Sequence, residues 1–139
     1  MNPPATSPGD PALLAAALAA RANAHAPYSG YAVGAALRDE AGGIFAGCNV
    51  ENAAYPVGTC AEAGAIAAMA AAGGRRIAAI LVCADGAAVV APCGACRQRI
   101  REFAGDDARI LLADLVAVRH ATTLGALLPA SFGPEHLGG

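Results

Sequence analysis

The sequence predicts an α/β fold: a three-layer α/β/α sandwich on a mixed sheet of about five strands. Three observations predict it. The chain has 139 residues, a length that suits one domain. Apolar residues recur with a helical period in some segments, whereas other segments alternate at period two or form short continuous apolar runs. The two kinds of segment follow one another along the chain, so helices are expected on both faces of the sheet.

The expected elements are joined by short connections. They are a helix over residues 11–24, strands over 31–37 and 44–50, a helix over 60–72, a strand over 77–83, a helix over 93–103, a strand over 109–115 and a short helix over 123–128. Residues 1–9 are rich in Pro, Ser and Gly and are expected to form a flexible leader. Residues 10–139 are then expected to form a single domain.

The first half of the chain predicts a helix followed by a hairpin. Asp10 is a suitable N-cap, and Pro11 occupies the first helical position. After a break at 27–30, residues 31–37 alternate between larger and smaller side chains, which is the period of a strand. Residues 44–50 return after a glycine-containing turn as its hairpin partner.

The second half predicts helices alternating with buried strands. The helix over 60–72 ends at Gly73 and Gly74, as helices often do. Residues 77–83 form a continuous apolar run, typical of a central strand buried on both faces. Pro92 introduces the next helix, and another apolar run follows it. Because 39 residues of the chain are alanine, the core is small in volume, and self-association is expected.

Charge and hydropathy exclude two classes of partner. Nine Lys and Arg against eleven Asp and Glu give a net charge of -2, with no basic field to hold a nucleic-acid backbone. The longest apolar runs fall short of the ~20 residues that span a bilayer, so no membrane partner is expected. Asp10 precedes the first apolar run where an export signal needs a cation, and the predicted location is cytoplasmic.

Three cysteines have the spacing of a metal site. Cys93 and Cys96 form a Cys-x-x-Cys pair, and Cys60 lies 33 residues before Cys93. All three fall at the first turns of expected helices, where unpaired backbone N–H groups and the helix dipole favour thiolate. Three protein ligands leave one coordination position open, as in catalytic zinc sites. A chain without an export signal uses cysteines more often for metal or catalysis than for disulfides.

The fourth position decides between a structural and a catalytic metal. Cys48 and Cys83 are the candidate fourth ligands, but both fall in expected strands, where a small buried thiol is common. Glu62, two residues after Cys60, favours the open site because its carboxylate could move protons for a metal-activated water. Taken by itself, Glu62 could equally stabilise a helix N-terminus.

Several blocks together resemble one enzyme family. The zinc motif, with three cysteines in place of one histidine and two, resembles that of the zinc-dependent deaminases. The matching blocks are residues 27–37, 47–53, 60–62, 92–96 and 127–135. From about residue 10 to the end, the chain resembles the small homotetrameric cytidine deaminases.

The resemblance implies a function in pyrimidine salvage. Cytidine and 2′-deoxycytidine would be hydrolysed to uridine and 2′-deoxyuridine with release of ammonia, using one Zn²⁺ per subunit. Zinc-activated water would attack C4 of the ring, and Glu62 would carry its proton to N3 and then to the leaving amine. By the same resemblance, the chain is a hydrolase acting on a cyclic amidine.

The resemblance also implies substrate-binding residues. Asn49 and Glu51 match residues that bind the ribose hydroxyls, and the backbone of Ala61 matches an acceptor for the exocyclic amine. Tyr31 matches a phenylalanine beside the ring, and Phe132 matches an aromatic contributed by a neighbouring subunit. On the residues alone, Asn49 and Glu51 could also be an exposed strand end, Tyr31 a core residue and Phe132 an aromatic that packs the C-terminal tail.

One position departs from the family pattern. Many members carry an arginine directly after the glutamate, where this chain has Ala63. Three thiolates exceed the charge of Zn²⁺ by one, so a compensating cation is expected, and Arg97 beside Cys96 is the nearest candidate in sequence. A solvent-facing helical arginine is the alternative for Arg97. The absence of arginine at position 63 predicts a slightly more basic metal-activated water.

Three other functions are compatible with a zinc motif. A relative that deaminates a cytosine-bearing antibiotic such as blasticidin S would share the zinc core, but Asn49 and Glu51 favour a ribose. A polynucleotide editor would need a basic, aromatic-rich groove. A non-catalytic zinc module that binds a protein would need neither Glu62 nor an open coordination position.

Overall fold

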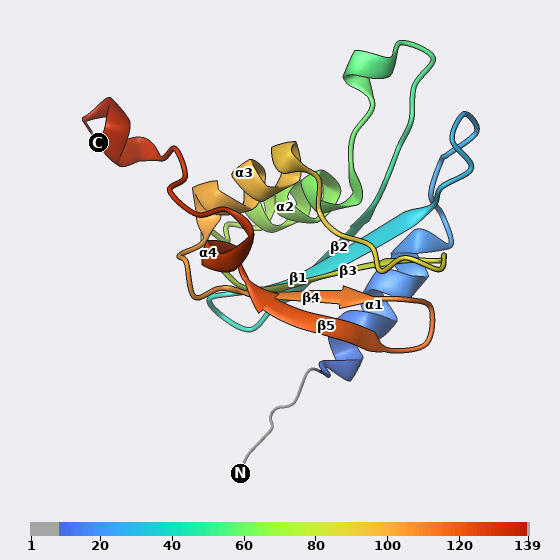
Figure 1. Ribbon diagram of the computed structural model, residues 1–139, viewed down its shortest axis with the longest axis horizontal. Helices are drawn as coiled ribbons and strands as arrows, with labels where there is room; N and C mark the ends of the chain where they lie inside the picture. The colour runs from blue at the N-terminus through green and yellow to red at the C-terminus, as the bar shows by residue number, and fades with distance from the viewer. Residues whose placement is uncertain (1–8, 139) are drawn as a thin grey trace.

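The computed structural model describes residues 9–138, so residues 1–8 of the expected leader lie outside it. The elements are α1 (Pro11–Arg21), β1 (Val33–Asp39), β2 (Ile44–Cys48), the 3₁₀ helix η1 (Tyr55–Val57), α2 (Ala61–Ala71), β3 (Ile77–Ala84), α3 (Gly94–Phe103), β4 (Arg109–Ala113), β5 (Val118–Thr123), α4 (Leu124–Leu127) and the 3₁₀ helix η2 (Pro134–Leu137). They form one five-stranded sheet with helices on both faces (Figure 1).

The sheet is mixed, as predicted. Its strand order is β2-β1-β3-β4-β5. β1 runs antiparallel to both β2 and β3, β3 and β4 are parallel, and β5 is antiparallel to β4. The parallel pair β3 and β4 is connected through α3, and α2 leads from β2 into β3. Because β2 and β3 run in the same direction, α2 and α3 begin at the same end of the sheet.

The core has two layers, one on each face of the sheet. On one face, α2 and α3 pack over the apolar side chains of the central strands, among them Ile80 and Val82. On the other face, α1 packs over the alternate side chains, among them Leu81. This alternation confirms that the apolar run of β3 is buried on both sides. The three-layer α/β/α arrangement is confirmed.

Small residues allow the helices to lie close to the sheet. A Cβ added at Gly34 would collide with the carbonyl oxygen of Ala17 in α1. A Cβ added at Gly47 in β2 would lie 2.6 Å from the carbonyl oxygen of Ala61 in α2. At both places backbone contacts backbone, which explains how an alanine-rich chain fills its core.

Two elements differ from the expectation. Sequence reasoning did not identify β5, because this edge strand is largely exposed and its sequence has no apolar alternation. The first helix ends at Arg21, earlier than the expected residue 24, and Asp10 caps it by accepting a hydrogen bond from the backbone N–H of Leu13. No helix in residues 9–138 has the length and apolar character needed to cross a membrane.

Candidate active site

The three predicted metal ligands come together where α2 and α3 begin. Cys60 is the N-cap residue of α2, Cys93 is the N-cap residue of α3, and Cys96 lies one turn into α3. Their Sγ atoms all lie within 4.8 Å of one another, and those of Cys60 and Cys93 are 4.0 Å apart. Tetrahedral zinc with Zn–S bonds of about 2.3 Å separates its sulfurs by roughly 3.8 Å. The cluster therefore suits zinc with little rearrangement.

Neither candidate fourth sulfur joins this cluster. Cys83 packs among the residues beneath α1, on the opposite face of the sheet. Cys48 ends β2, and in the described part of the chain the metal-binding group consists of Cys60, Cys93 and Cys96. Residues 9–138 therefore do not assemble the four protein ligands that a structural zinc requires.

The thiols differ in their acidity before any metal binds. Burial raises the pKa of Cys60, and burial together with the charge of Glu62 raises the pKa of Cys96. Burial also opposes ionisation of Cys93, but hydrogen bonds from the Cys96 backbone and from the other two thiols leave the pKa of Cys93 below its ordinary value. The expected effect of the helix N-termini is thus outweighed by burial at two of the three sulfurs. A metal that binds here displaces protons.

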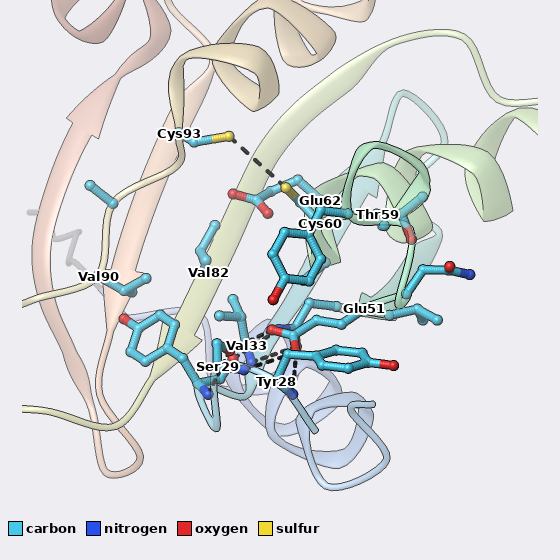
Figure 2. A pocket seen from close by; sticks show the side chains of 18 residues that line it. Tyr28, Ser29, Val33, Glu51, Thr59, Cys60, Glu62, Val82, Val90 and Cys93 are labelled. Carbon is cyan, nitrogen blue, oxygen red and sulfur yellow. Dashed lines mark hydrogen bonds between the residues drawn. The ribbon is translucent and has the colours of Figure 1, made fainter. Parts of the chain in front are cut away.

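Glu62 lies beside the sulfurs in the first turn of α2. Its side chain is buried, with 3% of the residue exposed, and its carboxyl group lies next to Cys60 (Figure 2). Burial raises the pKa of Glu62 above its ordinary value. A buried carboxyl group with a raised pKa beside a metal site can accept a proton and return it. This is the chemistry expected of Glu62 from the sequence.

A cavity of about 590 Å³ opens above the cluster (Figure 2). Cys60, Glu62 and Cys93 lie at one end of it, and Val82 and Val90 form apolar walls. Its other lining residues are Tyr28, Ser29, Tyr31, Val33, Asn49, Val50, Glu51, Asn52, Tyr55, Gly58, Thr59, Ala61 and Ala91. Among the described residues that line it, two are carboxylates and none is Lys, Arg or His.

Asn49 follows β2 and connects it to the loop before β1. Its side-chain Oδ1 accepts a hydrogen bond from the backbone N–H of Val33 at 2.9 Å, and its Nδ2 donates to the carbonyl oxygen of Tyr31 at 2.8 Å. Asn49 therefore fixes the position of Tyr31, which is 44% exposed at the cavity. The amide that sequence reasoning placed on the ribose already has two protein partners.

Glu51, two residues after Asn49, also accepts hydrogen bonds from the segment that precedes β1. Its Oε1 accepts hydrogen bonds from the backbone N–H groups of Tyr28 and Ser29, at 3.0 and 3.1 Å, and its Oε2 accepts one from the Ser29 hydroxyl. The Ser29 hydroxyl and backbone hydrogen bonds lower the pKa of Glu51, so it is a carboxylate near neutral pH. Oε1 accepts two hydrogen bonds, but Oε2 accepts one and has a further lone pair, so Glu51 keeps the capacity to accept a hydrogen bond from a ligand.

Phe132 lies away from the cavity of its own chain. The C-terminal segment extends from the body of the molecule beyond α4 (Figure 1). There Phe132 is 55% exposed and stacks on His136, with ring centroids 5.1 Å apart. Gln98 in α3 donates a hydrogen bond to the carbonyl oxygen of Phe132 at 2.9 Å, and Arg101 contacts Glu135 at 2.9 Å. Helix α3 thus positions a segment that presents an aromatic ring to solvent.

The arginine that contacts a ligand sulfur is Arg99, which sequence reasoning missed. Nη1 of Arg99 lies 3.6 Å from Sγ of Cys96. Arg97, the residue that sequence reasoning selected, donates instead to the carbonyl oxygens of Pro92 and Leu127, both at 2.9 Å. Adjacent helical residues point in different directions, whereas residues three apart share a face. That spacing from Cys96 was the signal available in the sequence.

Comparisons with known proteins agree with this site. Residues 9–124 match the family described as the cytidine and deoxycytidylate deaminase zinc-binding region. A cytidine deaminase of Sporosarcina psychrophila is 43% identical over 125 residues, covering 90% of this chain and 92% of that protein. A cytidine deaminase of Mycobacterium tuberculosis is 43% identical over 119 residues, 85% of each chain.

Solved structures give the same result. The crystal structure of cytidine deaminase from Burkholderia pseudomallei superimposes with a TM-score of 0.81 at 46% identity, covering 87% of this chain and 97% of that one. Cytidine deaminase from Mycobacterium tuberculosis gives a TM-score of 0.77 at 38% identity, covering 88% and 95% of the two chains. The similarity extends over both helices that carry the sulfur cluster. This chain therefore belongs to the zinc-binding cytidine deaminase family.

Proposed function

We propose that this chain catalyses the hydrolytic deamination of cytidine and 2′-deoxycytidine, yielding uridine or 2′-deoxyuridine and ammonia. One observation carries the proposal: a cluster of three cysteine sulfurs that suits zinc lies beside a buried carboxyl group at the end of a nucleoside-sized cavity. Pyrimidine salvage in the cytoplasm is the process that this activity would serve. One zinc ion per subunit would be held by Cys60, Cys93 and Cys96.

Zinc, when bound, is a Lewis acid that makes water a nucleophile near neutral pH. The protein supplies the proton transfers. The Glu62 carboxylate accepts a proton from the attacking water as the new C4–O bond forms, and delivers it to N3 of the ring. The second proton of that water, now on the C4 hydroxyl, passes through Glu62 to the exocyclic amine. The C4–N bond breaks, the C4 oxygen becomes the product carbonyl, and ammonia leaves. The raised pKa of Glu62 suits it to carry these protons.

The cavity favours a neutral nucleoside over a nucleotide. Glu51 and Glu62 line it without a nearby lining cation, so a 5′-phosphate would meet negative charge and no counter-ion. We assign Tyr31 to the face of the base and the backbone carbonyl of Ala61 to the exocyclic amine. Glu51 would accept hydrogen bonds from the ribose. Asn49 would act there too, and it also holds the loop that carries Tyr31.

We also propose a homotetramer in which Phe132 completes the cavity of a neighbouring subunit. Support comes from an exposed aromatic on a segment that α3 holds away from its own cavity. If the proposal is right, Phe132→Ala should weaken cytidine binding and leave zinc content unchanged, with sedimentation reporting the assembly. An active monomer would count against shared sites.

The test of the main proposal is the loss of cytidine absorbance with purified protein, compared with Glu62→Ala. Wild-type protein should turn over cytidine, while Glu62→Ala should retain zinc and lose turnover. A wild-type protein that binds zinc but is inert on cytidine would overturn the proposal. Turnover of blasticidin S alone would then favour a deaminase of cytosine-bearing antibiotics. No turnover of either compound would favour a zinc module that binds a protein.

A further inference from the structure

The three-sulfur site carries an unbalanced charge. Metal binding requires the deprotonated form of cysteine, so three thiolates around a divalent ion leave a net charge of -1. Glu62, buried beside them, adds a further negative charge when it is ionised. A cation that contacts the cluster would offset this charge, and position 63, directly after Glu62, is alanine.

The guanidinium of Arg99 lies against the cluster. Its Nη1 is 3.6 Å from Sγ of Cys96, which is within the range of a hydrogen bond to sulfur. The other arginines of α3 point elsewhere, since Arg97 donates to backbone carbonyls and Arg101 to Ser131 and Glu135. The positive charge of Arg99 also acts on Glu62. Burial raises the pKa of Glu62, and the positive charge of Arg99 opposes that rise.

We propose that Arg99 is a positioning residue for the metal: it holds Cys96 in the orientation of a ligand and offsets one negative charge of the cluster. The inference rests on the proposed use of the cluster for zinc. Arg99 touches neither substrate nor the reacting atoms. It acts through Cys96, because a hydrogen bond to a thiolate lowers the energy of the sulfur lone pair and reduces electron donation to the metal.

An arginine placed in α2 could take over the role of Arg99 in α3. Arg99 stands three residues after Cys96 in α3, and Ala63 stands three residues after Cys60 in α2. Residues three apart lie on one face of a helix, so an arginine at position 63 could approach Cys60 as Arg99 approaches Cys96. Ala63 is partly exposed, which leaves room for a longer side chain.

The first measurement is zinc affinity, by competition with a chromogenic chelator. Arg99→Leu removes the charge and the hydrogen bond, and it should weaken zinc binding about 10- to 100-fold, as loss of an outer partner of a metal ligand does. Arg99→Lys keeps the charge and should recover part of that loss. Ala63→Arg in the Arg99→Leu background should also recover part of it. Arg119→Gln is the matched control, because Arg119 lies in β5, pairs with Asp114 and is outside the sulfur cluster, so it should leave zinc affinity unchanged.

The second measurement is electronic and separates the proposal from a packing role. In the cobalt(II)-substituted protein, the thiolate-to-cobalt absorption band should move to longer wavelength in Arg99→Leu, because the sulfur loses its hydrogen-bond donor. The band should return toward its original position in Arg99→Lys. If Arg99→Leu unfolds, Arg99→Met, which keeps an unbranched side chain and loses both the charge and the hydrogen-bond donor, takes its place in both measurements.

The outcomes distinguish this inference from the proposed function. Zinc affinity within about twofold of wild type, together with an unmoved cobalt band, would overturn the role of Arg99 even if the protein deaminates cytidine. Weaker zinc binding that neither Arg99→Lys nor Ala63→Arg improves would overturn the charge argument. A shifted band and weaker zinc binding in a protein inert on cytidine would sustain the role of Arg99 and reject the proposed reaction.

Discussion

Gly47 in β2 faces the first turn of α2 at a distance that leaves no room for a side chain. A Cβ at this position would lie 2.5 Å from the backbone N of Ala65, 2.6 Å from the carbonyl oxygen of Ala61 and 2.8 Å from the carbonyl carbon of Gly64. Ordinary contacts begin at 3.4 Å, so Gly47→Ala requires α2 to move away by about 0.9 Å, the difference between 3.4 and 2.5 Å. All three clashing atoms are backbone, and no side-chain rotation relieves them.

The cost can be estimated from this geometry. Overpacking a well-packed core costs about 1–3 kcal/mol, and three backbone clashes place Gly47→Ala near the upper end. Replacing a strand glycine with alanine returns about 0.5–1 kcal/mol through the unfolded chain. The net loss is therefore about 2 kcal/mol, or roughly 8 °C in Tm for a domain of this length. Because α2 carries Glu62 and begins at Cys60, a shift near 1 Å should also lower kcat/KM by about 10- to 100-fold.

Thermal unfolding and cytidine turnover of Gly47→Ala measure both effects. Gly94→Ala is the control for Tm, because Gly94 is the first residue of α3 and a Cβ there has no atom within 4 Å. Its Tm should stay the same or rise by a few degrees. If Gly47→Ala unfolds within about 2 °C of wild type, the close approach of β2 and α2 does not constrain the site and the reasoning is wrong.

Three further predictions concern charged residues. Asp10→Ala should lower unfolding free energy in urea by about 1–2 kcal/mol, because it removes the cap of α1 and the ion pair with Arg38. The Arg38 hydrogen bond lowers the pKa of Asp10, so this difference should shrink below about pH 4; a constant difference would contradict it. In metal-free protein, Glu62→Gln should raise Tm at pH 7, because burial raises the pKa of Glu62 and the folded state pays for its ionisation. The gain should vanish below about pH 4.3, where the carboxyl group is protonated in both the folded and the unfolded state. If Glu62→Gln and wild type have the same Tm at pH 7 as well as at low pH, the prediction is wrong. Arg101→Ala should raise KM for cytidine by up to about fivefold with zinc content unchanged, because an exposed pair contributes at most about 1 kcal/mol to holding the segment of Phe132. An unchanged KM would mean that this segment takes no part in substrate binding.

The sulfur cluster was predictable because its geometry is local. Cys93 and Cys96 lie within one helical turn, and Cys60 and Cys93 both precede a helix that the sequence marks clearly. The two helices follow β2 and β3, which flank β1 and run in the same direction, so their N-terminal thiols meet at one end of the sheet. Glu62 follows from the same argument, since the first turn of α2 fixes its position relative to Cys60.

Other features depend on contacts that sequence spacing does not encode. Strand β5 is held by pairing with β4 and needs no apolar alternation of its own, so its sequence resembles a loop. Asn49 and Glu51 were expected to face a ligand, and their hydrogen bonds to the preceding loop come from a tertiary contact between segments about 20 residues apart. Arg97 was selected because it is next to Cys96 in the sequence, and Arg99 was missed because the nearest residue in sequence is not the nearest on a helix.

The alanine-rich composition and the active site have a common physical basis. A core of small side chains buries little apolar surface per residue, which lowers the hydrophobic stabilisation of the fold. The same small side chains let the backbone of α2 approach β2 at Gly47, and that approach determines where Cys60 and Glu62 stand. A larger residue at this contact would clash with the backbone of α2 and move the helix that carries the glutamate. The site therefore depends on the small residues at this contact, and a larger residue at position 47 is expected to lower stability and activity together.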